Sequence, residues 1–221
     1  CCILCYGLSC QWKSKRADPH SALPRDEITL ITLIPATVDY AAELLQFELE
    51  NRAFFEARIN ARPSSFYSLE GITKALELAE QDALADVGYQ YLIVAAQGID
   101  SMEHDSPENT SHYIVGRINL SRVRRAHFHS AELGYRIAQA ACGQGFASKA
   151  IGLVMAKAFT ELQLVRLEAT ASEINHASIR ALQRNGFSQF GRARRSFELQ
   201  GCWYDLLHFE AHANYEFLHQ I

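Results

Sequence analysis

The stretch CGQGFASK, residues 142–149, decides how this chain folds. Two glycines, Gly143 and Gly145, enclose one residue directly before a run of helix-forming residues. A chain that passes through such a turn into a helix leaves the first helical amides without intrahelical partners. These amides lie at the positive end of the helix dipole, and glycine lets an anion approach them closely. The stretch therefore predicts either a plain turn or a loop that binds a diphosphate.

Two known phosphate-binding patterns do not fit this loop. It lacks the third glycine and the downstream acidic residue of a dinucleotide-binding fold, and it contains no GKS or GKT sequence. The G-x-G pattern by itself is therefore a weak signal, and the surrounding sequence has to decide its meaning.

Strand and helix patterns surround the loop on both sides. We expect a strand over residues 128–137, a helix over 143–162 and a strand over 166–172, which together form one parallel βαβ unit. The remaining strands must pair antiparallel, so the fold class is α/β (α+β), with a mixed, mostly antiparallel central sheet flanked by helices. Further strands are predicted over residues 28–34, 89–96, 112–120, 188–197 and 202–211. Further helices are predicted over 38–55 after Thr37, 69–87 after Ser68 and 175–185, and a polar loop over 97–111.

Composition is that of an ordinary globular protein. The chain has 221 residues, of which 48% are hydrophobic and 21% charged, and its net charge is −4. This charge argues against nucleic acid or an anionic membrane surface as a partner, and no apolar run is long enough to span a membrane. The body of the chain contains only Cys142 and Cys202, which is no disulfide framework, so we expect a reducing cytoplasm.

The first 25 residues follow no clear secondary-structure period. We interpret residues 1–25 as a flexible or non-native leader and residues 26–221 as a single domain. The residues Cys2, Cys5, Cys10 and His20 leave open a zinc site, although no second paired ligand motif accompanies them.

The sequences on either side of the glycine loop resemble a known superfamily. They read ELGYRIAQAACGQGFASKAI at residues 132–151 and ASEINHASIRALQRNGF at residues 171–187. Both resemble the GNAT superfamily of acyl-CoA-dependent N-acetyltransferases, with Ala140 at a position where that superfamily usually has Gln or Arg. Residues 50–68 and 115–137 further resemble the RimJ and RimL branch, which acetylates the N-terminal alanine or serine of ribosomal proteins. The resemblance covers about residues 26–213.

The resemblance implies acetyl-CoA as co-substrate and no metal. Backbone amides of the glycine loop would hold the diphosphate, and the strand that ends near residue 137 would splay from the next parallel strand to pair with the pantetheine arm. A bulge at residues 138–140 would accompany this arrangement. The residues that would bind the co-substrate are Ile137, Ala138, Gln139, Cys142, Gly143, Gln144, Gly145, Phe146, Ala147, Asn175 and Ser178.

The chemistry implied by the resemblance is attack of a neutral amine on a thioester. At pH 7 roughly 10–15% of α-amines are neutral, against less than about 0.1% of lysine side chains, so an N-terminal amine needs only a modest base. We expect Glu132 to be that base and Ser178 to face the sulfur. Many superfamily members have a tyrosine where this chain has Leu182, so either Ser178 assists the leaving thiolate or no dedicated acid exists. Asn175 would also fit a plain helix cap, and Glu132 a surface carboxylate.

Three functions remain open at this point. The first is an N-terminal protein acetyltransferase, for example of a ribosomal protein, acting as a monomer or homodimer. The second is acetylation of a small amine, such as a polyamine, an amino acid or an antibiotic, and the third is a regulator that binds acyl-CoA without turnover. Other residues with an uncertain part in the acceptor site are Glu48, Glu50, Asn51, Arg52, His127 and His129, whereas Tyr135, Cys142 and Trp203 are expected to be structural.

Overall fold

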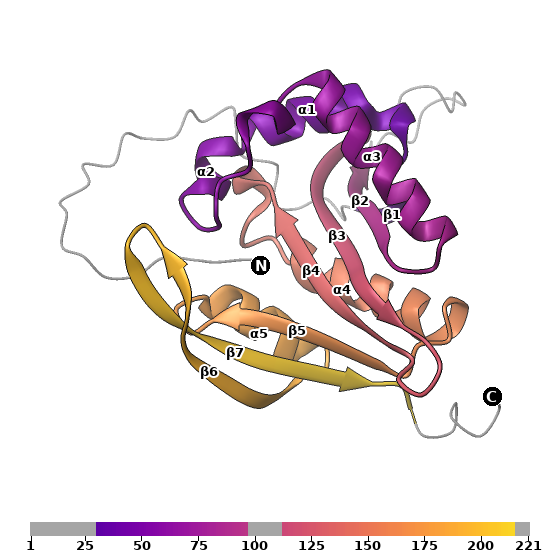
Figure 1. Ribbon diagram of the computed structural model, residues 1–221, viewed down its shortest axis with the longest axis vertical. Helices are drawn as coiled ribbons and strands as arrows, with labels where there is room; N and C mark the ends of the chain where they lie inside the picture. Colours follow the sequence, from indigo (N-terminus) through magenta and orange to yellow (C-terminus); the bar gives the residue numbers. More distant parts are fainter. Residues whose placement is uncertain (1–29, 97–111, 215–221) are drawn as a thin grey trace, which may run out of the picture.

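The computed structural model describes residues 30–96 and 112–214, which form one mixed sheet covered by helices on both faces (Figure 1). Its strand order is β1-β2-β3-β4-β5-β7-β6, and only the β4–β5 pair is parallel. This confirms the predicted mixed, mostly antiparallel sheet and its single parallel unit. The strands are β1 (Leu30–Pro35), β2 (Tyr89–Ala96), β3 (His112–Arg124), β4 (Ser130–Ile137), β5 (Arg166–Ser172), β6 (Ser188–Leu199) and β7 (Cys202–His212).

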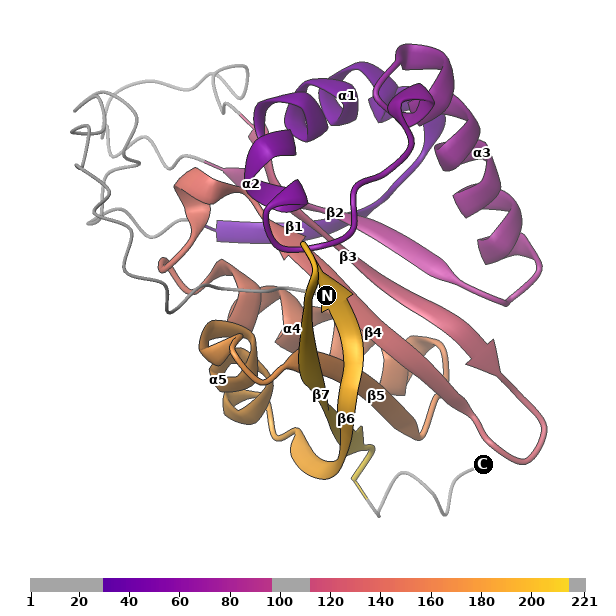
Figure 2. The same ribbon diagram turned by 60° about the vertical axis from the view of Figure 1, so that its left-hand side comes forward.

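Helices α1 and α3 pack on one face of the sheet, and α4 and α5 pack on the other (Figure 2). Strand β2 explains how both faces are covered, because Leu92 and Val94 belong to the core beneath α1 and α3 while Ile93 and Ala95 belong to the core beneath α4. The α-helices are α1 (Ala41–Glu50), α2 (Arg52–Glu56), α3 (Leu69–Leu84), α4 (Phe146–Ala156) and α5 (His176–Arg184). Short 3₁₀ turns are η1 (Val38–Tyr40), η2 (Ser64–Phe66) and η4 (Gln139–Ala141), and η5 (Lys157–Glu161) is a π-helical segment.

The first predicted helix is interrupted. A continuous helix over residues 38–55 is wrong, because a 3₁₀ turn opens this segment and the chain breaks between α1 and α2 at Asn51. The predicted cap by Thr37 makes no side-chain hydrogen bond. The prediction for Ser68 is confirmed, since its side chain accepts a hydrogen bond from the Gly71 amide at the start of α3.

Strands β4 and β5 pair over only part of their lengths. Their register runs from Ser130 opposite Arg166 to Leu133 opposite Ala169 and then stops. Beyond that point β4 continues through residues 134–137 and stays paired with β3, while β5 continues through 170–172 and stays paired with β7. The sheet therefore opens between two parallel strands, as the resemblance implied.

Several expectations fall on residues outside the described ranges. These are the leader at 1–25 with its possible zinc ligands, the start of the first strand at residues 28–29, and the polar loop at 97–111. None of the helices in the described ranges is long and apolar enough to cross a membrane.

Candidate active site

The glycine loop lies directly before α4. Gly143 has φ 81° and Gly145 has φ 83°, a left-handed conformation that L side chains rarely adopt. A Cβ atom at either position would meet no other atom within 4 Å. Glycine is therefore required here by the backbone conformation and not by crowding within the protein, and the space beside the loop is open.

The start of α4 presents a row of backbone donors. The first bond of the helical ladder runs from the Lys149 amide to the Gly145 carbonyl at 3.0 Å. Among the described residues, the amides of residues 143–147 have no hydrogen-bond acceptor. Cys142 differs, because its amide already donates to the Gln139 carbonyl at 3.2 Å. Of the six amides predicted to hold an anion, the five of Gly143, Gln144, Gly145, Phe146 and Ala147 are thus free to do so.

The strand end before this loop departs from the expected bulge. Residues 139–141 form a 3₁₀ turn, and the Gln139 amide donates to the Asn51 side chain at 2.9 Å. The Ala138 amide donates to the Val115 carbonyl of β3 at 2.8 Å. Because peptide groups alternate along a strand, those of Ile137 face the opening toward β5. Of the three residues expected to pair with pantetheine, Ile137 alone directs its peptide groups into the gap.

Asn175 and Ser178 meet across the first turn of α5. Asn175 is fully buried, and its Oδ1 accepts a hydrogen bond from the Ser178 amide at 3.1 Å, so the predicted cap is confirmed. Its Nδ2 is buried and has no hydrogen-bond partner among the described residues. A buried donor without a partner is costly, and an acceptor supplied by a ligand would satisfy it.

Ser178 has a partner that sequence reasoning missed. Its Oγ lies 2.7 Å from the hydroxyl of Tyr135, which extends from β4 in the segment that flanks the opening. Both side chains are buried. Leu182, at the position where many superfamily members have a tyrosine, is fully buried in the core. A tyrosine hydroxyl therefore does reach this region, from a strand and not from the helix.

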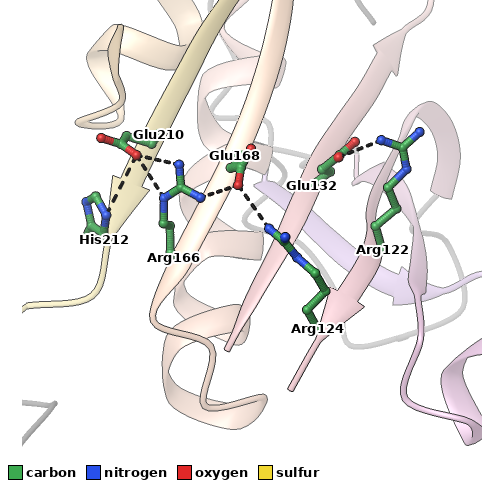
Figure 3. Close-up of polar contacts among 7 residues, drawn as sticks. All are labelled: Arg122, Arg124, Glu132, Arg166, Glu168, Glu210 and His212. Carbon is green, nitrogen blue, oxygen red and sulfur yellow. Dashed lines mark hydrogen bonds and ion pairs between the residues drawn. The ribbon is translucent and has the colours of Figure 1, made fainter. Parts of the chain in front are cut away.

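Glu132 lies in a row of ion pairs on the sheet (Figure 3). Its side chain is 43% exposed, and its Oε1 accepts a hydrogen bond from Arg122 at 2.8 Å. Glu168 of β5 stands opposite it in the register and is bound by Arg124 and Arg166. Glu132 therefore sits where β4 and β5 still pair, just before they separate.

Other predicted residues lie away from this region. His127 and His129 belong to the loop between β3 and β4 and lie at the end of β4 opposite the opening. Trp203 is exposed on β7. Cys142 is exposed, its thiol donates to the Ala138 carbonyl at 3.3 Å, and partial desolvation of the sulfur raises the pKa of the thiol, which disfavours the reactive thiolate.

The four residues where α1 ends and α2 begins, which are Glu48, Glu50, Asn51 and Arg52, differ in how far they are buried. Glu48 and Asn51 are buried and do not lie at a solvated helix end. Glu50 is exposed and accepts from Gln46, and Arg52 pairs with Glu56 within α2. Within residues 30–96 and 112–214, no group of three or more His, Cys, Asp or Glu side chains could hold a metal ion.

This geometry has close counterparts among known proteins. Residues 31–188 match the family model described as "Acetyltransferase (GNAT) domain". The "Probable N-acetyltransferase YjcK" of Bacillus subtilis (strain 168) is 31% identical over 171 residues, covering 77% of this chain and 87% of that protein. The chain therefore belongs to the GNAT acetyltransferase family.

Solved structures agree with this assignment at the level of the fold. The ribosomal-protein-S5-alanine acetyltransferase of Vibrio fischeri has a TM-score of 0.71 and 19% identity, covering 86% of this chain and 98% of that chain. Mycobacterium smegmatis RimJ, solved in complex with CoA-disulfide, has a TM-score of 0.69 and 23% identity, covering 83% and 82%. The RimJ/RimL resemblance is thus confirmed in the architecture of the chain.

Proposed function

We propose that this acetyltransferase binds acetyl-CoA in the opening between β4 and β5 and transfers its acetyl group to the α-amine of a protein N-terminus. The single observation that carries the proposal is the opening itself, which is headed by five backbone amides and flanked by the buried Asn175 side chain. Hydrogen-bond donors at a helix start suit a diphosphate, and Asn175 Nδ2 suits a carbonyl of the pantetheine arm. The residues present therefore fit this co-substrate.

Each residue around the opening would have a distinct part. The thioester supplies an activated acetyl group. The amides of residues 143–147 hold the diphosphate, and the peptide groups of Ile137 orient the arm that follows. The Ser178 and Tyr135 hydroxyls, 2.7 Å apart, stabilise the negative charge that develops on sulfur. Two linked hydroxyls can share this charge because each polarises the other.

Glu132 would accept the proton of the attacking amine, directly or through water. Its position where β4 and β5 begin to separate supports this part, as does the exposed fraction of its side chain. An α-amine is already partly neutral at pH 7, so this base needs to act on only a modest fraction of the acceptor.

The choice of acceptor rests on the structural neighbours. One is a ribosomal-protein-S5-alanine acetyltransferase, and another is RimJ. We infer by analogy that the acceptor is a protein N-terminus beginning with alanine or serine, for example that of a ribosomal protein.

A thiol-release assay with acetyl-CoA tests the proposal. The panel contains peptides with free N-terminal alanine or serine, the same peptides with a blocked N-terminus and an internal lysine, and a polyamine. We expect release with the free N-terminal peptides only. Release with the polyamine alone would replace this proposal by small-amine acetylation.

A further inference from the structure

One cavity of the molecule has three arginines among the residues that line it. It has a volume of about 160 Å³, and its walls include Arg62, Arg117 and Arg136 together with Gln90 and Tyr135. It lies on the α1 side of the sheet, because Arg117 and Arg136 both extend to Glu48 of that helix. The cavity is therefore separate from the diphosphate loop at the start of α4.

One carboxylate, that of Glu48, binds two of the three arginines. Glu48 is fully buried; its Oε1 accepts from Arg117 at 2.7 Å and its Oε2 accepts from Arg136 at 3.1 Å. Arg117 also donates to the Gln90 side chain at 2.9 Å. No Asp or Glu lines the cavity among the described residues. The cluster therefore carries a surplus of positive charge in a poorly solvated place, where electrostatic interactions are strong.

The third arginine has unused hydrogen-bonding capacity. Arg62 stacks on the Phe66 ring at 4.3 Å, and its Nε is buried without a partner among the described residues. Burial and the positive charges of Arg136 and Arg117 lower the pKa of the Arg62 guanidinium to about 10. At neutral pH the Arg62 guanidinium is still protonated. A nearby anion would offset its repulsion by Arg117 and Arg136 and would accept a hydrogen bond from its Nε.

The cavity adjoins the opening in the sheet. Arg136 and Tyr135 are neighbours in the segment of β4 that has left β5, and the Tyr135 hydroxyl touches Ser178. A group bound by Arg136 would thus lie across β4 from the hydroxyl pair. An acceptor held there would have its anionic group close to the position of its reacting amine.

We propose that this cavity binds an oxyanion, a carboxylate or a phosphate, that the acceptor carries close to its amine. Arginine forks match both groups geometrically, and Arg117 and Arg136 already hold a carboxylate of the protein itself. The inference rests on the proposed function and adds to it a preference for acidic N-terminal sequences.

The test compares acceptor peptides that differ in one side chain. Peptides with a free N-terminal alanine carry glutamate, phosphoserine or glutamine, placed in turn at the second, third and fourth positions, and the full chain is assayed with acetyl-CoA. We expect kcat/KM for an anionic peptide to exceed that of its glutamine counterpart by about tenfold or more, mainly through KM. Glutamate and phosphoserine, compared with each other, identify the oxyanion.

Variants of Arg62 locate the effect. Arg62→Gln should abolish the preference, and Arg62→Lys should restore part of it, because lysine keeps the charge but loses the fork. The control is Lys74→Gln, which removes one positive charge from an exposed ion pair on α3 and should leave the preference intact. Equal kcat/KM values in the wild type, or a preference that survives Arg62→Gln, would overturn the proposal.

Binding without turnover separates this inference from the proposed function. If no peptide is acetylated, the proposed function fails. Calorimetric titration of the same peptides into the CoA-loaded protein then tests whether the cavity binds an oxyanion. Tighter binding of anionic peptides by the wild type than by Arg62→Gln supports the oxyanion site. Equal binding of anionic and glutamine peptides contradicts it.

Discussion

At the scale of single residues, Glu48 is the buried carboxylate that compensates the positive charges of two arginines. Arg117 and Arg136 stand directly opposite each other in the β3–β4 register, where like charges destabilise a sheet, and Glu48 bridges them. Glu48→Gln would leave buried guanidinium groups without a counter-charge. We expect it to lower the free energy of unfolding by about 3–5 kcal/mol, measured by denaturant titration.

The matched control for Glu48 is Glu70→Gln. Glu70 is an exposed carboxylate paired with Lys74 on α3, so its loss should leave the denaturation midpoint almost unchanged. If both variants unfold at the same denaturant concentration as the wild type, the charge of Glu48 does not stabilise the fold.

Tyr135 is the residue whose part in catalysis is easiest to isolate. Tyr135→Phe removes one hydroxyl from a buried pair and keeps the ring in place. We expect kcat to fall about tenfold with little change in KM for acetyl-CoA, because the hydroxyl acts on the charge that develops on sulfur. Adding Ser178→Ala should cost little more, since the two hydroxyls act as a unit. Tyr91→Phe, another buried tyrosine in the same core cluster, serves as control, and equal losses in the two would argue against the pair.

The part of Glu132 as a base should show in the pH dependence of turnover. Glu132→Gln is expected to slow turnover most below about pH 7.5, where most of the acceptor α-amine is protonated, and little at high pH, where the amine is already neutral. The measurement is a pH profile of kcat/KM for a free N-terminal peptide. Glu168→Gln, which removes the neighbouring carboxylate in the register, should not change the profile's shape. A uniform loss at every pH would assign Glu132 to the ion-pair row alone.

At the scale of elements, Asp86 joins the end of α3 to the β3–β4 loop. Both its oxygens accept from Arg125, which also donates to the Leu162 carbonyl, and the hydrogen bond from Arg125 lowers the pKa of Asp86 below its ordinary 3.8. A carboxylate with a lowered folded-state pKa stabilises the protein above its unfolded-state pKa, and the effect disappears as pH falls through the folded value.

Asp86→Asn tests this connection. Asparagine tolerates the left-handed conformation at this position, where φ is 57°, so the substitution removes the charge without adding strain. We expect the variant to unfold at a lower denaturant concentration than the wild type at pH 7, with the difference closing as pH falls below 3.8. A constant difference across this range would mean that the ion pair contributes no pH-dependent stability.

The sequence predicted some elements completely and others only in part. Strands β2 and β5 have the predicted bounds, because β2 is an almost continuous buried apolar run and β5 alternates buried and partly buried residues. The predicted helix over 143–162 is shorter, since left-handed glycines delay its start to Phe146 and a π-helical segment follows Ala156. The break at Asn51 depends on hydrogen bonds to Phe47 and to the distant Gln139 amide, which no local pattern could reveal.

In the candidate site, too, local features could be predicted from the sequence and contacts between distant segments could not. The glycine loop and the Asn175 cap are local features, so a turn and a helix start could be predicted there from the sequence, while their part in binding a co-substrate was implied by the resemblance. The contact between Tyr135 and Ser178 and the cluster around Glu48 join segments far apart in the chain. They depend on strand register and helix placement, which the sequence pattern does not specify.

At the scale of the whole molecule, the proposed co-substrate site depends on where the sheet opens. The parallel strands β4 and β5 stop pairing after Leu133 and Ala169. The loop that follows β4 leads directly from this opening into the start of α4. Helices on both faces keep the outer strands in place, so the opening is part of the fold and not a frayed edge.

The most direct test is calorimetric titration of coenzyme A into the wild type, Gly145→Glu and Gly201→Glu. Both glycines are left-handed with open space around them, so both substitutions carry similar strain of about 1–2 kcal/mol and add the same charge. Only Gly145 adjoins the amides at the start of α4. We expect Gly145→Glu to weaken binding by about 100-fold, because its carboxylate would oppose the diphosphate, and Gly201→Glu to bind as the wild type does. Unchanged affinity in a folded Gly145→Glu protein would contradict the account.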